Sequence, residues 1–148
     1  LRSLKEETKA ELYVGKKVVR VIQRDVLKGL KEKGGESLVL GVDEKKFMEA
    51  DSVIMEQFFV EMKRNNFKER VLVREGDNYL PAYRKTTKYK FLPKEFFEPT
   101  STFIYGDKVA IVIFGTPLYG LVIENKKLAS AYRKQFELLW KNAKSKSF

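Results

Sequence analysis

The alternation of apolar runs and turn residues divides the first part of the chain into strands and helices. A short extended run at 11–14 ends at Gly15, and apolar residues then recur at three- and four-residue spacing from Val18 to Leu30, which predicts an amphipathic helix. The run SLVLGV at 37–42 is apolar throughout, as in a strand that is covered on both faces. We therefore expect this strand to be central in a sheet.

A second helix and a third strand continue the pattern. Asp51 or Ser52 can cap the helix by accepting a backbone amide. The buried face of this helix is predicted to contain Ile54, Met55, Phe58, Phe59 and Met62. Two asparagines at 65–66 end the helix, and the segment RVLVR at 70–74 predicts a short strand. Strands that alternate with helices favour right-handed crossovers and a parallel sheet with helices packed on it.

The pattern then changes to an irregular excursion followed by an antiparallel hairpin. The segment 75–99 carries three of the four prolines and is expected to hold one strand. Apolar runs at 102–105 and 109–114 are separated by the turn pair 106–107. A further turn leads back into 118–123, so we expect the hairpin at the end of the sheet.

The last element is predicted to be a helix of about five turns that is capped by Asn125. Its apolar positions form one stripe, which consists of Leu128, Ala129, Tyr132, Phe136, Leu139, Trp140 and Ala143. This stripe can pack on the sheet, or part of it can form a dimer interface. For the second alternative, the candidate interface residues are Tyr132, Phe136 and Trp140.

Together these elements predict one α/β domain over residues 1–148, with a mixed, mostly parallel sheet, a C-terminal antiparallel hairpin and helices packed on the sheet. A chain of 148 residues is long enough to bury a core without disulfides or metals. The first residue is Leu1, and the charged segment 1–9 resembles the end of a linker or helix. We therefore expect a further domain upstream of it.

Two absences in the composition exclude several kinds of chemistry. The chain contains no cysteine and no histidine, so disulfides, thiolate nucleophiles and Cys/His zinc sites are excluded. No carboxylate pair has a spacing typical of a glycosidase or a metal site, and no glycine pattern forms a phosphate loop. We therefore expect no cofactor, no metal and no catalytic residue. No signal peptide and no long apolar run is present, which predicts a cytoplasmic protein without membrane contact.

The positive charge of the chain is concentrated in one segment. Of the net charge of +10, most comes from 63–94, where ten basic residues stand against three acidic ones. Aromatic and basic residues are interleaved at 83–97 (YRKTTKYKFLPKEFF), as in proteins that bind single-stranded nucleic acid. Candidate nucleic-acid contacts are Arg84, Lys85, Lys88, Tyr89 and Lys90. The alternative is an amphipathic strand that turns Tyr89 and Phe91 inward and leaves the lysines in water, or docks them on an acidic surface.

Two stretches of the chain resemble a known family. The segment TSTFIYGDKVAIVIFGTPLYGLVIENKKLASAYRKQFELLWKNAK at 100–144 looks like the C-terminal part of the phospholipase D-like domain of archaeal-type TrmB-family transcription regulators. The segment ETKAELYVGKKVVRVIQRDVLKGLKEKGGESLVLG at 7–41 resembles the start of that domain. The resemblance implies a phospholipase D-like sandwich that senses an effector and forms a homodimer. It also implies that DNA is bound by a winged-helix domain upstream of Leu1.

The same resemblance allows a comparison with the phospholipase D motif, in which histidine, lysine and aspartate precede an apolar strand. Asp107 stands at the aspartate position, which places Thr102 at the lysine position and Thr100 at the histidine position. Threonine does not titrate near neutral pH, so it cannot attack phosphorus as an imidazole does or protonate a leaving oxygen. Because the chain has no histidine, a second copy cannot supply one. We therefore expect a binding domain and not an enzyme.

The family fold implies an effector cleft at the altered motif. Its candidate ligand-binding residues are Thr100, Thr102 and Asp107, with Arg74 as an anion partner. Hydroxyls, a carboxylate and a guanidinium suit a sugar or a phosphorylated small molecule. The alternative for Asp107 is a structural role, in which the side chain stabilises the turn at 106–107.

Overall fold

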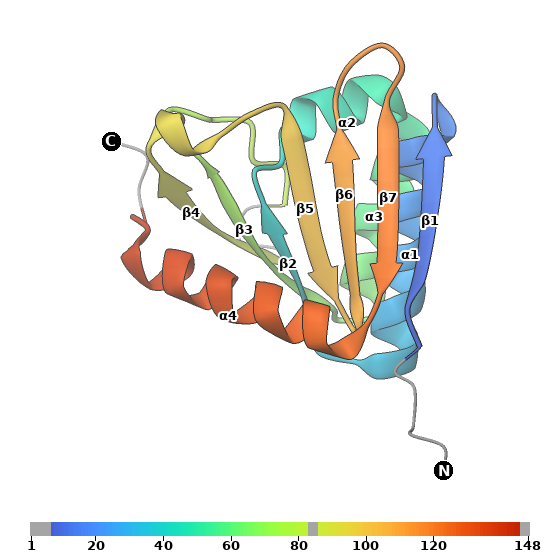
Figure 1. Ribbon diagram of the computed structural model, residues 1–148. Coiled ribbons are helices and arrows are strands. Elements are labelled where there is room, and N and C mark those ends of the chain that lie inside the picture. The colour runs from blue at the N-terminus through green and yellow to red at the C-terminus, as the bar shows by residue number, and fades with distance from the viewer. Residues whose placement is uncertain (1–6, 83–85, 146–148) are drawn as a thin grey trace.

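Seven strands form one sheet with helices on both of its faces in the computed structural model, which describes residues 7–82 and 86–145 (Figure 1). The elements in chain order are β1 (Lys9–Val14), α1 (Lys17–Lys33), β2 (Glu36–Leu40), α2 (Glu44–Ala50), α3 (Ser52–Arg64), β3 (Lys68–Arg74), β4 (Thr87–Leu92), the 3-10 helix η1 (Lys94–Phe96), β5 (Thr100–Tyr105), β6 (Lys108–Ile113), β7 (Tyr119–Glu124) and α4 (Lys126–Asn142). The predicted α/β class with a mixed sheet is confirmed. Of the segment expected to end a linker, residues 1–6 lie outside the described part, and Lys9 already belongs to β1.

The order of the strands differs from the expected one. The sheet runs β1-β7-β6-β5-β2-β3-β4, and among the described strands only the neighbours β2-β3 and β3-β4 are parallel. The other four neighbouring pairs are antiparallel, so the expectation of a mostly parallel sheet is wrong for the pairings. A parallel connection needs a crossover of about a dozen residues or more. The link at 93–99 is shorter, so β5 begins at the end of the sheet at which β4 ends and runs in the opposite direction. In addition, β1 pairs with β7 and forms the edge of the sheet. The predicted hairpin of β6 and β7 therefore lies next to the edge strand and not at the edge itself.

Local signals correctly located most helices. Asp51 caps α3 by accepting the Ile54 amide at 3.1 Å, and Asn125 caps α4 by accepting the Leu128 amide at 2.9 Å. The predicted inner face of α3 is buried, except that Phe59 is only half-buried. The short helix α2 was not predicted. It buries Phe47 completely. None of the helices in the described part of the chain is both long and apolar enough to cross a membrane.

The sheet separates two cores of different size. The larger core lies between the sheet and the helices α1, α2 and α3, while the smaller core lies under α4. Strand β2 contributes to both, because Val39 faces the larger core and Leu38 the smaller one. This confirms the prediction that the run at 37–42 is a central strand covered on both faces.

Helix α4 covers only part of its face of the sheet. It contacts β6, β5 and β2 and also covers Leu72 of β3 and Leu92 of β4, while Figure 1 shows β1, β7 and most of β6 without a helix on this side. Phe136 is 1% exposed and packs in the smaller core, where its ring stacks on Trp140 at a centroid distance of 5.8 Å. The expected packing of the apolar stripe on the sheet is therefore confirmed.

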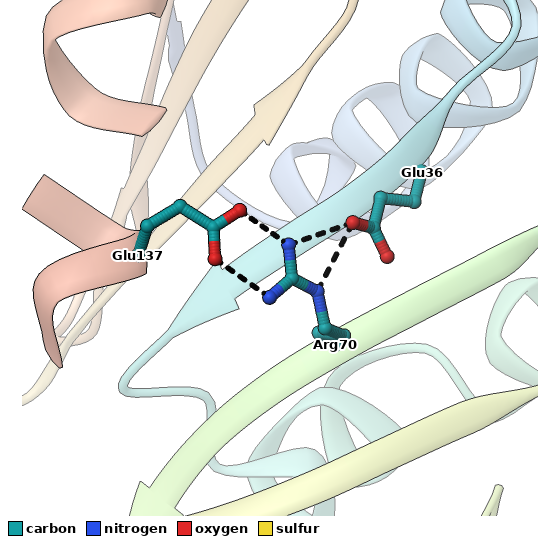
Figure 2. Close-up of polar contacts among 3 residues, drawn as sticks. All are labelled: Glu36, Arg70 and Glu137. Atoms are coloured by element: carbon teal, nitrogen blue, oxygen red, sulfur yellow. Dashed lines mark hydrogen bonds and ion pairs between the residues drawn. The ribbon is translucent and has the colours of Figure 1, made fainter. Parts of the chain in front are cut away.

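One arginine joins the sheet to α4. The Arg70 guanidinium on β3 donates two hydrogen bonds to Glu137 of α4, at 2.8 and 2.7 Å, and two to Glu36 of β2, at 3.0 and 2.7 Å (Figure 2). The guanidinium carbon lies 5.5 and 5.2 Å from the ring centroids of Phe136 and Trp140. The hydrogen bond from Arg70 lowers the pKa of Glu137. Bidentate pairing and ring contact together hold α4 at a defined place on the sheet.

Replacement of Arg70 is expected to destabilise the fold. In an Arg70→Met variant we expect the free energy of unfolding, measured by urea denaturation, to fall by about 1 to 2 kcal/mol, because four charge-assisted hydrogen bonds are lost. Arg70→Lys should not restore it, since an ammonium cannot pair with both carboxylates in the same plane. The matched control is Arg74→Met on the same strand. Arg74 is 47% exposed and contacts Asp77 at 3.4 Å, so the expected loss is below about 0.5 kcal/mol. Equal losses in the two variants would contradict the role of Arg70.

Candidate functional site

The four predicted effector residues do not form one site. Thr100 begins β5 and Arg74 ends β3, and both line a cavity of about 210 Å³. Asp107 follows the other end of β5. The five steps from Thr100 to Tyr105 span about 17 Å at about 3.4 Å per residue. The structure therefore brings Thr100 and Arg74 together and places Asp107 at the opposite end of the sheet.

The cavity contains charges of both signs. It lies at the carboxyl ends of the parallel strands β2 and β3, where open α/β sheets commonly bind ligands. Arg74 and Lys46 supply the positive charges, and Asp43, Asp77 and Glu98 the negative ones. Lys46 places its ammonium 5.6 Å from the ring centroid of Phe114. Such a set of groups can hold an anion beside hydroxyl groups.

A glycine allows β2 and β5 to approach each other closely at this cavity. Gly41 has φ of +82°, in the left-handed region, and a Cβ there would lie 3.0 Å from the backbone oxygen of Thr100. The backbone oxygen of Gly41 also accepts a hydrogen bond from Ser101 at 3.1 Å. A larger residue at position 41 would therefore push β2 and β5 apart at the cavity.

Thr102 and Asp107 have different surroundings from Thr100. Thr102 is half-buried on the α4 side of the sheet, next to Ile111 of β6. Asp107 lies in the turn between β5 and β6, where its carboxylate is 3.6 Å from the Lys33 ammonium and its backbone oxygen accepts from Asn125 at 2.9 Å. These contacts join the turn to the end of α1 and to Asn125 before α4.

The candidate nucleic-acid residues are also divided. Arg84 and Lys85 lie outside the described residues. Lys88 is exposed, and Lys90 donates to the backbone oxygen of Trp140 at 3.1 Å. Tyr89 is 5% exposed and donates to the carboxylate of Glu44, so its ring is not available to stack on a base. The expectation of an amphipathic strand that turns Tyr89 inward is confirmed, and base stacking by Tyr89 is excluded.

A buried pair of carboxylates was missed at the sequence level. Glu44 and Glu69 are 8% and 6% exposed. Burial raises the pKa of Glu44 to about 7 and that of Glu69 to about 8, and the nearby charge of Glu44 adds to the second shift. Strand alternation offered a signal, because Glu69 shares a face with Val71 and Val73, which both lie in the larger core.

The side chains of the candidate dimer residues are buried or half-buried within the protein. Phe136 is buried, while Tyr132 and Trp140 are half-buried beside it. A different apolar surface is exposed on β1, β6 and β7, on the side of the sheet that α4 leaves uncovered. We call it the open sheet face, and its most exposed members are Leu12, Val14, Ile113 and Tyr119. Sequence periodicity could not identify this surface, because it depends on which strands are neighbours.

The arrangement of strands and helices is that of phospholipase D-like domains. Nuc from Salmonella typhimurium, a phospholipase D family member, matches with a TM-score of 0.62 and 14% identity over 93% of this chain and 97% of that one. NucT from Helicobacter pylori matches with a TM-score of 0.58 and 10% identity over 93% and 98%. The predicted fold is therefore confirmed.

TrmBL2, an archaeal chromatin protein whose structure shows a novel mode of DNA binding, has the same fold. The match has a TM-score of 0.62 and 16% identity and covers 93% of this chain. It covers only 54% of TrmBL2, so this chain spans about half the length of that protein. No protein-family model and no curated protein matches the sequence. At such identities the likeness defines the fold.

The buried carboxylates predict how stability depends on pH. A glutamate in the unfolded chain has its ordinary pKa of 4.5, whereas Glu44 and Glu69 keep their protons up to about pH 7 and about pH 8. The stability that they contribute is complete below about pH 4.5 and is lost as the pH rises through these values. The chain has no histidine or cysteine to titrate in between. We therefore expect the free energy of unfolding, from urea denaturation, to fall by at least about 1 kcal/mol between about pH 5 and about pH 8.

The control for this experiment is a pair of exposed glutamates. Glu44→Gln with Glu69→Gln should flatten the pH profile, whereas Glu49→Gln with Glu56→Gln, both at exposed helix positions, should leave it unchanged. A flat profile in the unmodified chain would show that the two buried carboxyl groups are not held protonated.

Proposed function

We propose that this chain is the effector-sensing and dimerising domain of a TrmB-like transcription regulator and that it catalyses no reaction. The observation that carries the proposal is the match to TrmBL2 over 93% of the chain, combined with threonines where phospholipase D chemistry needs histidine and lysine. The phospholipase D family member Nuc has the same fold, so the fold alone does not decide between binding and catalysis. The residues at the motif positions favour binding.

The chemistry of the motif positions supports the absence of activity. Thr100 carries a hydroxyl that neither ionises nor accepts a proton near neutral pH, and the chain has no imidazole to activate it. Within the described residues, no group of three acidic side chains is placed to hold a metal ion in place of the imidazole. Substrate phosphates would therefore be bound without being cleaved.

In this proposal, DNA is bound through a winged-helix domain upstream of Leu1, in the cytoplasm. TrmBL2 is a chromatin protein that binds DNA, and this chain corresponds to about half of it. The domain described here would join two copies of the regulator and report the presence of an effector. Such a division of tasks requires a dimer surface and a ligand cavity.

The open sheet face fits the dimer surface better than the residues on α4 do. Leu12 is 64% exposed and Ile113 47% exposed, and both lie beside β7 through Leu121 and Tyr119. Strand alternation places only uncharged residues on this face of β1, β5, β6 and β7. Exposed apolar area of this kind in a chain of net charge +10 is typical of a surface covered by a partner. A second copy is the partner that makes the surface self-complementary.

Charges introduced on the open sheet face are expected to separate the dimer. In sedimentation equilibrium the unmodified chain should have twice the mass of the 17.3 kDa monomer. Leu12→Glu with Ile113→Glu should weaken dimerisation at least about hundredfold, because two buried charges would be unpaired. The matched control is Leu138→Glu, since Leu138 is 65% exposed on α4, away from this face. If Tyr132→Glu disrupts the dimer and the open-face variant does not, the interface lies on α4 as the sequence suggested.

The cavity beside Arg74 fits a small effector with an anionic group. Arg74 and Lys46 would bind a phosphate, while Asp43 and Asp77 would accept hydrogen bonds from hydroxyls and Thr100 would donate or accept one. A sugar or a phosphorylated metabolite has both kinds of group. The proposed site retains Thr100 and Arg74 from the sequence-based set. Thr102 lies outside the cavity lining, and Asp107 lies at the far end of β5.

A thermal-shift screen tests the effector site. Sugars and phosphorylated metabolites, with glucose 6-phosphate among them, should include at least one ligand that raises the Tm by a few degrees, because binding to the folded state stabilises it. Arg74→Ala should abolish this rise. Asp107→Ala, which removes a carboxylate at the other end of the sheet, should leave it intact. A blank screen, or an equal response in Arg74→Ala, would remove the cavity as the effector site.

The alternative is a stand-alone nucleic-acid-binding protein that uses 63–94. The exposed ammonium of Lys88 is the described feature of its candidate set that favours it. The burial of Tyr89 removes the stacking ring on which recognition of single strands would depend. This alternative therefore requires binding by charge alone.

A further inference from the structure

The outer surface of α4 carries a row of evenly spaced lysines. Lys127, Lys134 and Lys141 follow one another at intervals of seven residues, and all three are exposed. Seven residues correspond to two helical turns, so the three positions lie on one side of the helix, about 10 Å apart and about 21 Å from end to end. This side is opposite to Phe136, which is buried against the sheet. We call these three residues the α4 lysine row.

The α4 lysine row has little negative charge near two of its members. The one acidic residue of α4 is Glu137, and Arg70 holds its carboxylate at 2.8 and 2.7 Å, on the side toward the sheet. Within the described part of the chain, no carboxylate lies within ion-pair distance of Lys134 or Lys141. The positive potential at these two lysines is therefore not cancelled locally.

Helix α1 shows that this arrangement is not general for the chain. It also carries many basic residues, but four of them pair with carboxylates: Arg20 with Asp51 at 3.1 Å, Lys28 with Glu32 at 3.9 Å, Lys31 with Glu61 at 3.9 Å and Lys33 with Asp107 at 3.6 Å. The two helices lie on opposite faces of the sheet. Among the described residues, most basic residues of α1 are therefore paired with carboxylates, whereas Lys134 and Lys141 of α4 are not.

Strand β4 extends the basic surface next to the end of α4. It forms the sheet edge, and Phe91 and Lys144 exchange backbone hydrogen bonds of 2.7 and 2.9 Å that attach it to the chain after α4. Lys88 is exposed on this strand, on the same face as Leu92, which packs under α4. Lys88 has no carboxylate partner among the residues that the structure describes. It therefore adds an ammonium on the face of the sheet that α4 covers, where it lines a cavity together with Lys68 and Arg70.

We propose that the α4 lysine row, with Lys88 on the same face of the sheet, binds the phosphate backbone of duplex DNA without sequence preference. A duplex is a rigid polyanion with about one charge per 1.7 Å of axis, which a straight row of ammonium groups about 21 Å long can follow. Lysine contacts to phosphates position a protein on DNA and do not distinguish bases. A flexible single strand fits less well, because Tyr89 is buried and Trp140 is half-covered by the sheet, so neither ring offers stacking.

This inference goes beyond the proposed function, because it gives the domain itself a DNA contact in addition to any winged helix. The two proposals rest on different residues. Failure of the DNA contact would leave the dimer and the effector site untouched, and failure of those would leave the lysine row as it is.

Fluorescence anisotropy with a labelled duplex of arbitrary sequence tests the proposal on this chain. Lys134→Gln with Lys141→Gln should weaken binding about tenfold or more at low salt. It should also reduce the slope of log Kd against log salt concentration, between about 50 and about 200 mM, by about 1.8 for two lost phosphate contacts. The matched control is Lys17→Gln with Lys28→Gln on α1, which removes the same charge from exposed positions on the other face. It should change Kd by less than about twofold, since only long-range attraction is reduced.

Further variants keep the result interpretable. Lys134→Arg with Lys141→Arg preserves the charges and should retain binding, and urea denaturation should show that all variants fold. Three results would overturn the proposal: no binding of the duplex by the unmodified chain at low salt, equal loss in the α4 and α1 variants, or equal binding by the α4 variant and the unmodified chain. Tighter binding to single-stranded RNA or to vesicles containing phosphatidylserine, lost in the α4 variant, would assign the surface to that partner instead of duplex DNA.

Discussion

The guanidinium of Arg70 joins α4 to the sheet, and the candidate surfaces on this side of the sheet depend on the position of that helix. Arg70 shares its face of β3 with Leu72, so its charge is tolerated only because two carboxylates and two aromatic rings surround it. The pairing with Glu137 ties the helix to β2 and β3 (Figure 2). In this position α4 leaves the open sheet face uncovered. Glu137, the one acidic residue of α4, has its carboxylate bound to Arg70.

The topology explains why the phospholipase D motif positions do not act as one site here. The motif places Thr100, Thr102 and Asp107 within eight residues, but β5 is extended, so the first and the last of them lie at opposite ends of the sheet. The residues that join Thr100 come from other strands, with Gly41 after β2 and Arg74 at the end of β3. A cavity at this edge is therefore assembled from parts of the chain that no local motif contains.

Local periodicity predicted the elements well, and contacts between distant segments explain what it missed. The caps Asp51 and Asn125 and the two-faced strand at 37–42 were readable because each signal lies within a few residues. The short helix α2 has too few turns to show a period, although Asp43 caps it at 3.2 Å. The pairing of β1 with β7 and the attachment of Glu137 to Arg70 join residues more than 60 positions apart, and no local pattern encodes them. The open sheet face and the cavity both depend on such contacts.

The open sheet face and the α4 lysine row affect association of two copies in opposite ways. Apolar strands on the open sheet face favour association of two copies, yet each copy brings a net charge of +10, which opposes it. A polyanion along α4 would neutralise part of that charge on both copies, whereas a free dimer must tolerate it. A polyanion that binds the dimer more tightly than the monomer shifts the equilibrium toward the dimer. Because such coupling is reciprocal, dimerisation raises the affinity for the polyanion by the same factor. Association and polyanion binding should therefore strengthen each other, through charge alone and without any change of conformation.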